Sequence, residues 1–543
     1  MYQVTLETSY FPRQQDVELR DLTVGDALRA AAARWGDREA MVEAAADGST
    51  ARRWTYAQML ADSERLARAL LTRFAPGERV AVWAPNIPEW VLLEYGAALA
   101  GLTLVTVNPG YQPRELAYVL RQSRAAGLFL VKEHRGNPMA RIAAEVAGDL
   151  PALREITDLE DQAALLRCAG EPPDLPRVDP HNPAQIQYTS GTTGFPKGVV
   201  LHHFGLTNNA RHRFTLAKIG ECQTTMCMFP LFHTAGCSLA VLGTMQSGGR
   251  MVLPRQFDPH GALALIEQEG VAATTVVPTM LIAMLEAHAQ RPRDTSSLQV
   301  VGSGGAMVPP ELVREVTSRF GCRFYIVYGQ TEASPVLTMT WPDDSFEDTC
   351  TTIGQAMPQI ELAIFDLAGG GILPLGQAGE ICARTYAAMI GYNDDPEATA
   401  QAIDADGWLH TGDLGTMDAR GYVRITGRVK DMIIRGGENL FPAEIENVLL
   451  EHPDVAEVAV VGVPDARFGE AVAAFIRPAP GTTLNPDCLK AHCRSQIAAQ
   501  KTPTHWVEVS EWPLTGSGKI QKFELRRRWI EAREVRCDGA HPT

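Results

Sequence analysis

Residues 188–198 read Tyr-Thr-Ser-Gly-Thr-Thr-Gly-Phe-Pro-Lys-Gly, a run of small and hydroxyl-bearing residues that closes with a lysine. Its glycines allow the backbone to take positive φ and to approach a ligand closely, while its hydroxyl groups and Lys197 offer donors and one positive charge. These residue types suit a polyphosphate. A solvated Ser/Thr/Gly turn between two strands is the competing interpretation, and the length and order of the run argue against it.

The flanks of this loop predict two strands, 184–188 and 198–201, so the loop joins a strand to a strand. A Walker A loop needs Gly-Lys followed at once by Ser or Thr and then by a helix. Here Gly198 follows Lys197. The loop is therefore a phosphate-binding candidate of a different type.

Two further candidate loops follow predicted strands. Residues 298–301 run into Gly302-Ser-Gly-Gly-Ala306, and residues 323–327 run into Tyr328-Gly-Gln-Thr-Glu-Ala333. Because ligands of open parallel sheets bind at the carboxyl ends of strands, we expect both loops to face one crevice. Met307 stands where a dinucleotide fingerprint would need its third glycine, which argues against that motif.

The elements that position these loops predict an α/β chain. A length of 543 residues exceeds one ordinary core, so two or more domains are expected. The predicted helices are 24–35, 55–73 and 88–100, and the predicted strands are 79–83, 103–107, 128–131 and 271–277, in the rhythm of a parallel sheet. The last hundred residues predict helices at 442–451 and 486–499 with strands at 455–463 and 470–477, which suits a small α+β domain.

The composition limits which binding partners and which cellular location are expected for the protein. A net charge of −15 without a basic run disfavours nucleic acid as a partner. The ten cysteines lack metal-ligand spacing, which favours reduced and mostly buried thiols. The N-terminus has no signal pattern, and no apolar run approaches membrane-spanning length. These features predict a cytoplasmic protein without a transmembrane segment.

The loop at 188–198 resembles the phosphate-binding signature of the adenylate-forming (ANL) superfamily, which includes acyl-CoA synthetases, luciferases and peptide-synthetase adenylation domains. At least six motifs follow the order of that family between about residues 25 and 532, and the chain resembles its AMP-dependent acid-CoA ligases. The resemblance implies a large multi-sheet N-terminal domain with parallel α/β subdomains at 1–429, a hinge at Lys430, and a small mobile α+β C-terminal domain at 431–543.

The resemblance also implies a nucleotide site. In the family the first loop holds the β- and γ-phosphates of ATP, the glycine-rich segment and an aromatic side chain flank the adenine, and an aspartate and an arginine contact the ribose. The implied nucleotide-binding residues are Thr189, Ser190, Gly191, Thr192, Thr193, Gly194, Lys197, Gly304, Gly305, Ala306, Tyr328, Gly329, Gln330, Thr331, Asp413, Arg428, Asn439 and Lys519. Glu332 is the implied magnesium ligand.

The implied reaction is a two-step ligation. A carboxylate attacks the α-phosphorus of ATP to give an acyl-adenylate and pyrophosphate, and a thiol then displaces AMP. The implied catalytic residues are Lys519, Glu332, Thr331, His233 and Lys197. Gly436 and Gly437 match the segment along the pantetheine route, where adjacent glycines permit close approach. The expected cofactors are ATP, Mg²⁺ and coenzyme A.

The acid is implied to bind near His233, Cys237, Gly304, Pro335 and Val336. Residues 229–238 contain no aspartate to pair with an α-amino group, so an acid without that group is favoured. Small or apolar pocket residues, with no cationic or amide group obviously placed for a polar tail, favour a medium- or long-chain fatty acid or a bulky hydrophobic acid.

Alternatives stay open for several of these predictions. The acid could be an aryl or cinnamic acid, and the acceptor could be a carrier-protein phosphopantetheine in place of free coenzyme A. A homodimer is a further option. A catalytically silent nucleotide-binding or assembly protein is disfavoured, because every charged motif residue is present.

Overall fold

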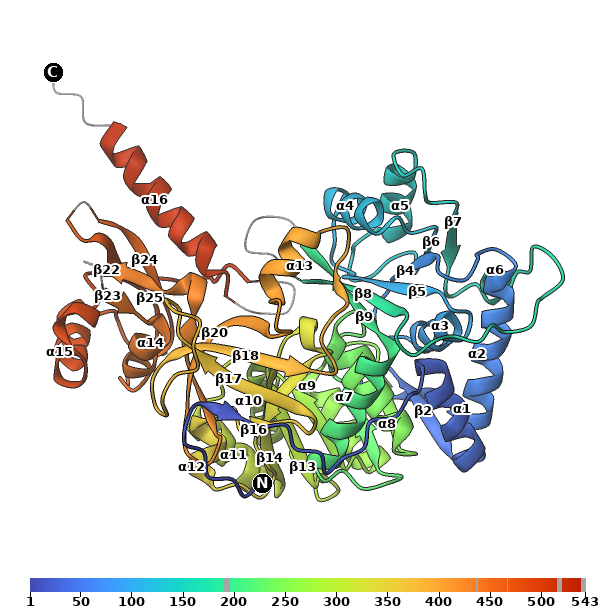
Figure 1. Cartoon of the computed structure of the whole chain (residues 1–543), viewed down its shortest axis with the longest axis horizontal. Helices are drawn as coiled ribbons and strands as arrows, with labels where there is room; N and C mark the ends of the chain where they lie inside the picture. The colour runs from blue at the N-terminus through green and yellow to red at the C-terminus, as the bar shows by residue number, and fades with distance from the viewer. Residues whose placement is uncertain (190–195, 436–437, 466, 515–519, 539–543) are drawn as a thin grey trace.

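The computed structural model describes residues 1–189, 196–435, 438–465, 467–514 and 520–538 (Figure 1). Within this part the strands form four sheets, three in a large N-terminal domain and one in a smaller C-terminal domain. This arrangement confirms the predicted α/β class with two domains of unequal size.

A seven-stranded sheet has the order β19-β9-β8-β5-β4-β6-β7. Its strands are β4 (Arg79–Trp83), β5 (Thr103–Val107), β6 (Gly127–Leu130), β7 (Glu155–Asp158), β8 (Pro183–Thr189), β9 (Lys197–His202) and β19 (Gly391–Tyr392). Strands β4 to β8 are parallel, whereas β9 runs antiparallel to both β8 and β19. The phosphate-loop candidate therefore joins two antiparallel strands, as the sequence predicts.

A nine-stranded sheet has the order β16-β15-β14-β13-β12-β10-β11-β2-β3. Its strands are β2 (Glu39–Ala44), β3 (Thr50–Thr55), β10 (Thr224–Met226), β11 (Arg250–Pro254), β12 (Ala273–Val276), β13 (Val300–Gly304), β14 (Arg323–Gly329), β15 (Val336–Met339) and β16 (Gln355–Ala356). The parallel strands β13 and β14 are neighbours, with Gly304 opposite Val327. The two predicted strand-end loops therefore begin side by side.

The helices of the N-terminal domain pack around these sheets. They are α1 (Val24–Trp35), α2 (Tyr56–Leu71), α3 (Pro88–Leu99), α4 (Pro113–Ser123), α5 (Met139–Ala147), α6 (Gln162–Leu165), α7 (His203–Leu216), α8 (Gly243–Gln246), α9 (Pro259–Glu269), α10 (Pro278–Gln290), α11 (Pro310–Phe320), α12 (Phe346–Thr351) and α13 (Pro396–Ala402), with a π-helical segment η1 (Ala235–Leu242). Thr55 and Gln58 form a capping box at the start of α2. Helix α3 is buried on every side, and its residues join the largest hydrophobic cluster.

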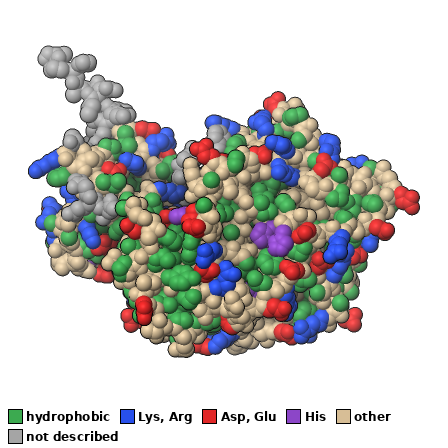
Figure 2. Space-filling model, viewed as in Figure 1, with side chains coloured by type: hydrophobic (Ala, Val, Ile, Leu, Met, Phe, Trp, Pro, Cys, Tyr) green, Lys and Arg blue, Asp and Glu red, His purple; other side chains and the backbone are tan. Residues whose placement is uncertain are grey.

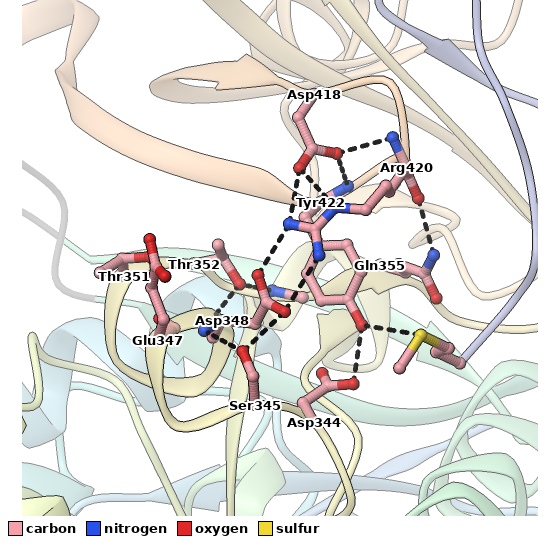
Figure 3. A network of polar contacts seen from close by, with 12 residues as sticks. Asp344, Ser345, Glu347, Asp348, Thr351, Thr352, Gln355, Asp418, Arg420 and Tyr422 are labelled. Carbon is pink, nitrogen blue, oxygen red and sulfur yellow. Dashed lines mark hydrogen bonds and ion pairs between the residues drawn. The ribbon is translucent and has the colours of Figure 1, made fainter.

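The third sheet is antiparallel, with the order β1-β17-β18-β20-β21. Its strands are β1 (Tyr10–Phe11), β17 (Ile360–Phe365), β18 (Gly379–Thr385), β20 (Leu409–Met417) and β21 (Val423–Arg428). The turn of the β20–β21 hairpin is tied to α12 and β16 by the polar network in Figure 3. There the Arg420 guanidinium donates to both carboxylate oxygens of Asp348, at 3.0 and 2.7 Å, and Gln355 donates to the Arg420 carbonyl at 2.7 Å.

The C-terminal domain lies beside this third sheet, and α16 extends outward from it (Figure 1). Its elements are β22 (Ile433–Arg435), β23 (Glu438–Leu440), α14 (Pro442–Leu450), β24 (Val455–Asp465), β25 (Gly469–Pro478), α15 (Pro486–Gln496), β26 (His505–Glu508) and α16 (Lys522–Asp538). These bounds confirm the helices and strands predicted for this region. None of the helices in the described ranges is long and apolar enough to span a membrane.

Candidate active site

Tyr328, Asp413 and Arg428 form a hydrogen-bonded cluster at the open end of the β20–β21 hairpin. The Tyr328 hydroxyl donates to Oδ2 of Asp413 at 2.8 Å, and Nε of Arg428 donates to Oδ1 at 3.0 Å. Asp413 and Arg428 are paired across the two strands. Desolvation and the neighbouring Asp413 charge hold the pKa of Tyr328 well above its ordinary value, so Tyr328 stays protonated and can donate a hydrogen bond to the carboxylate. We call this group the ribose cluster, after the role that the resemblance implies for Asp413 and Arg428.

Residues that sequence reasoning did not single out hold the turn before Asp413. Glu380 accepts from the Gly412 N–H at 3.0 Å and contacts Nδ1 of His410 at 2.9 Å. The Thr411 hydroxyl accepts from the Asp413 N–H at 3.1 Å. His410 and Thr411 lie directly before Gly412 and Asp413 in the chain, which is their one sequence signal. Glu380 lies on a different strand, β18, and carries none.

A second cluster joins Glu332, Tyr392 and Lys197. Glu332 lies in a short 3₁₀ segment, Thr331–Ala333, directly after β14. The Tyr392 hydroxyl donates to Oε1 of Glu332 at 2.8 Å, and the Lys197 ammonium lies 4.7 Å from the centroid of the Tyr392 ring. Burial and the Glu332 charge raise the pKa of Tyr392. We call this group the phosphate cluster.

Tyr392 was missed at the sequence level because it reaches the cluster only through strand pairing. It lies on β19 opposite Val199 of β9, almost 200 residues away in the chain. A lone tyrosine after a glycine carries no spacing signal of its own. Its ring nevertheless connects the predicted magnesium ligand to the lysine of the phosphate loop.

Glycines are needed at the ends of β13 and β14, where the two predicted loops begin. A Cβ on Gly329 would lie 1.9 Å from the carbonyl oxygen of Pro335, so no side chain fits there without moving the backbone. Gly305 has φ of +78°, in the region that favours glycine. The predicted residues at these two strand ends and just beyond them are Gly304, Gly305, Ala306, Gly329, Gln330, Thr331, Pro335 and Val336.

The hinge candidate Lys430 lies in a 3₁₀ segment, Val429–Asp431, between the two domains. Its pKa is lowered first by desolvation and then by Arg428, while the charges of Asp413 and Glu332 act in the opposite direction. The Lys430 ammonium is therefore within electrostatic reach of both clusters.

His233 lies in a loop that two neighbouring strands hold in place. Asn86, after β4, donates to the Phe229 carbonyl at 2.9 Å, and Thr106 on β5 donates to the Phe232 carbonyl at 2.8 Å. Nδ1 of His233 accepts from the Ala235 N–H at 3.1 Å. This contact places the histidine directly at the start of the π-helical segment.

Cys237, a predicted pocket residue, is fully buried on that segment and faces β8. Its sulfur accepts from the Gln187 amide at 3.1 Å and contacts Oε1 of Gln185 at 3.4 Å. Burial raises the pKa of Cys237 well above the usual thiol value. A separate face of the same segment, with Ala235, Leu239 and Ala240, lines a cavity that also reaches β12.

Several predicted site residues fall outside the described part of the chain. They are Ser190, Gly191, Thr192, Thr193, Gly194, Gly436, Gly437 and Lys519. The backbone of Asn439 pairs with Ile434 in the C-terminal sheet, and its side chain is not among those described.

The chain belongs to the AMP-binding enzyme family, which matches residues 28–393, and the C-terminal domain of that family matches residues 444–519. This membership confirms the resemblance inferred from the motifs and makes the protein an acid-thiol ligase of the acyl-CoA synthetase type.

Several similar proteins match along most of their length. YngI of Bacillus subtilis is 40% identical, with 95% of this chain and 98% of YngI covered. The mitochondrial medium-chain acyl-CoA ligase ACSF2 of Rattus norvegicus is 35% identical, with 96% of this chain and 89% of ACSF2 covered. ATP-bound MatB from Rhodopseudomonas palustris is 28% identical, with a TM-score of 0.83 over 94% of this chain and 99% of MatB.

Proposed function

We propose that this enzyme activates a carboxylic acid as its acyl-adenylate and then transfers the acyl group to coenzyme A. The observation that supports this most strongly is that the end of β14 contributes to both clusters: Tyr328 on the strand belongs to the ribose cluster, and Glu332 directly after it belongs to the phosphate cluster. A carboxylate such as Asp413 can accept from both hydroxyls of a ribose diol. The phosphate cluster supplies the Lys197 charge beside it.

The residues of the phosphate cluster suit a magnesium ion. Mg²⁺ is usually held by one or two carboxylates together with substrate phosphates and water. Glu332 would hold it, and Tyr392 orients the carboxylate by donating to Oε1. When bound, the ion neutralises charge that develops on the phosphates.

Domain alternation is part of the proposal. Residues 1–429 bind ATP and the acid, Lys430 is the pivot, and residues 431–543 carry Lys519 and part of the coenzyme A route. Lys519 would orient the incoming carboxylate during the first step and leave during the second. A cytoplasmic location and a homodimer stay predictions.

The proposed acid has a largely apolar body, as in a medium- or long-chain fatty acid or a bulky hydrophobic acid. An aryl or cinnamic acid is the alternative substrate, and a carrier-protein phosphopantetheine is the alternative acceptor. The name of ACSF2 supports a medium-chain acid.

A panel of acids tests the proposal, with pyrophosphate release as the first readout and the mass of the thioester as the second. We expect acid-dependent pyrophosphate and acyl-CoA from free coenzyme A. Acyl transfer to a carrier protein alone would overturn the proposed acceptor, and absence of pyrophosphate with every acid would overturn the adenylation step.

A further inference from the structure

Glu380, Cys382 and His410 bring a carboxylate, a thiol and an imidazole together beside the turn before Asp413. Nδ1 of His410 lies 2.9 Å from Oε2 of Glu380 and 3.4 Å from Sγ of Cys382. The three ligand atoms lie within 4.8 Å of one another, and no second cluster of this kind occurs among the residues that the structure describes. Carboxylate, thiolate and imidazole are all ligands that Zn²⁺ accepts.

The spacing of these atoms is close to that of a tetrahedral zinc site. Bonds of about 2.3 Å to sulfur and about 2.0–2.1 Å to nitrogen and oxygen place neighbouring ligand atoms about 3.4–3.6 Å apart. The distance of 3.4 Å between Cys382 Sγ and His410 Nδ1 fits this value. The distance of 2.9 Å between His410 and Glu380 is that of a hydrogen bond, and it would open by about 0.5 Å when an ion replaces the proton.

The cluster has a side that water reaches and an apolar side. The side chains of His410 and Glu380 are 32% and 16% exposed, so an ion can approach the ring and the carboxylate from solvent. Cys382 is buried in a small apolar cluster with Ala363 and Trp408. An apolar wall of this kind limits the access of water to a bound metal. An ion that enters from the exposed side would therefore meet the thiol at the bottom of the site.

Asp404 faces the other nitrogen of the His410 ring. Its Oδ2 lies 3.5 Å from Nε2, while its Oδ1 accepts from the N–H groups of Asp406 and Trp408 at 3.0 and 2.8 Å. A neutral imidazole has one N–H, so it can donate to only one of the two carboxylates that flank it. An ion on Nδ1 leaves the proton on Nε2 for Asp404, which is the usual carboxylate–histidine–zinc arrangement.

We propose that Glu380, Cys382 and His410 form a zinc-binding site with water as the fourth ligand, separate from the magnesium site proposed at Glu332. On binding, the thiol releases its proton to water and the ring keeps its proton on Nε2. Mg²⁺ prefers oxygen ligands, so it is not expected to compete for a site with sulfur and nitrogen ligands. The site goes beyond the proposed function, because it depends on neither the acid nor the acceptor.

The ion would fix the turn that carries Asp413. Oε1 of Glu380 accepts from the Gly412 N–H at 3.0 Å, and zinc on Oε2 leaves that hydrogen bond in place. The ion would also join β18 to β20, because Cys382 and His410 are paired across these strands. The sequence showed no metal-ligand spacing because strand pairing brings the two residues together across 28 positions of the chain.

The test is a titration of the full-length, chelator-treated protein with Co²⁺ in the presence of excess Mg²⁺. Co²⁺ reports zinc sites because a cobalt–thiolate bond gives a charge-transfer absorption band in the near ultraviolet. The excess Mg²⁺ occupies sites made of oxygen ligands alone. We expect one equivalent of Co²⁺ to produce the band and Zn²⁺ to remove it by displacement.

Three variants assign the band to this cluster. Cys382→Ser should abolish it, whereas Cys322→Ser, which changes another buried thiol, is the matched control and should retain it. Asp404→Asn keeps an oxygen for the two backbone N–H groups but loses the charge facing Nε2, so we expect Zn²⁺ affinity to fall by about 10- to 100-fold. Loss of the thiolate ligand itself should cost at least about 100-fold.

Thermal unfolding gives an independent readout. Zn²⁺ should raise the melting temperature of the wild type and not that of Cys382→Ser. Wild-type protein without the cobalt–thiolate band, or a band that Cys382→Ser retains, would overturn the proposal. Equal Zn²⁺ affinity in Asp404→Asn and the wild type would contradict the proposed arrangement, and this comparison still decides if Cys382→Ser does not fold. No substrate enters these measurements, so failure of the proposed function would leave them unaffected.

Discussion

The two ends of the β20–β21 hairpin carry arginine–carboxylate pairs with different surroundings. At the turn, Arg420 donates to Asp348 through two nitrogens and to Asp418 through Nε at 3.1 Å (Figure 3). At the open end, Arg428 donates to Asp413 through Nε at 3.0 Å, its one hydrogen bond to a described residue. Both arginine side chains are about half exposed, so the two pairs differ in the number of their hydrogen bonds within the described part of the chain and not in exposure.

The pair at the turn contributes to the stability of the fold, whereas the pair at the open end is the one proposed to bind the nucleotide. Ser345 also donates to Asp348, so the carboxylate at the turn has its oxygens occupied by the protein. The Asp413 carboxylate is held by two donors and faces the strand ends where the nucleotide is proposed to lie. Elsewhere, acidic and basic side chains are interspersed over the face seen in Figure 2, and exposed pairs there contribute little to stability.

The largest expected effect is loss of nucleotide binding at the open end. Asp413→Asn keeps the shape but removes the charge and one good acceptor, so we expect kcat/KM for ATP to fall on the order of 10²-fold. Asp418→Asn makes the same change at the turn and should leave ATP kinetics within about 2-fold. Pyrophosphate release measures kcat/KM for ATP in both variants. Equal losses would contradict the proposal that the two ends have different roles.

The phosphate cluster should respond more weakly. Tyr392→Phe removes the donor to Glu332 but keeps the ring beside Lys197, so we expect a loss of about 10-fold, the low end of the range for one hydrogen bond to a charged group. Titration with Mg²⁺ should show the loss as a weaker apparent affinity for the ion. An unchanged Mg²⁺ dependence would mean that Tyr392 does not orient the carboxylate.

For the free energy of unfolding we expect the opposite order, with the larger effect at the turn of the hairpin. Arg420→Met removes the hydrogen bonds that a half-exposed arginine donates to Asp348 and Asp418, and we expect a cost of about 1 kcal/mol with little change in kcat. Arg428→Met removes one hydrogen bond from an equally exposed arginine and should cost less than about 0.5 kcal/mol. Thermal unfolding measures both, and a larger cost for Arg428→Met would reverse the comparison.

The smallest effect is on the pH dependence of stability. Hydrogen bonds from Arg420 lower the pKa of Asp348 in the folded protein. The pair therefore contributes its full stability above the ordinary aspartate pKa of about 3.9, and that contribution is lost as pH falls through the folded value. The gap in melting temperature between wild type and Arg420→Met should be constant near pH 6 and narrow below about pH 4. A gap that widens in acid would contradict this sign.

Local patterns predicted the elements of this fold well. The helix at 24–35 has the bounds expected from its periodicity, and the loop after Thr189 joins two strands as its flanks indicated. The two strand-end loops lie next to each other because β13 and β14 are parallel neighbours. These features depend on short-range sequence.

Contacts that depend on packing between distant parts of the chain could not be predicted from the sequence. Tyr392 joins Glu332 only because β19 pairs with β9, and Glu380 holds the turn before Asp413 only because β18 pairs with β20. Helix α7 has little amphipathic pattern, yet most of it is buried beneath elements from distant parts of the chain. The burial of its Arg213 could therefore not be predicted from the sequence.

Isotope transfer from acid to nucleotide tests the central claim most directly. The substrate acid carries ¹⁸O at both carboxylate oxygens. Attack on the α-phosphorus followed by thiol displacement then leaves one labelled oxygen in AMP. We predict that mass spectrometry finds one ¹⁸O in each AMP, none in pyrophosphate, and one acyl-CoA for each AMP formed. Unlabelled AMP, or ADP with labelled phosphate, would contradict the acyl-adenylate route.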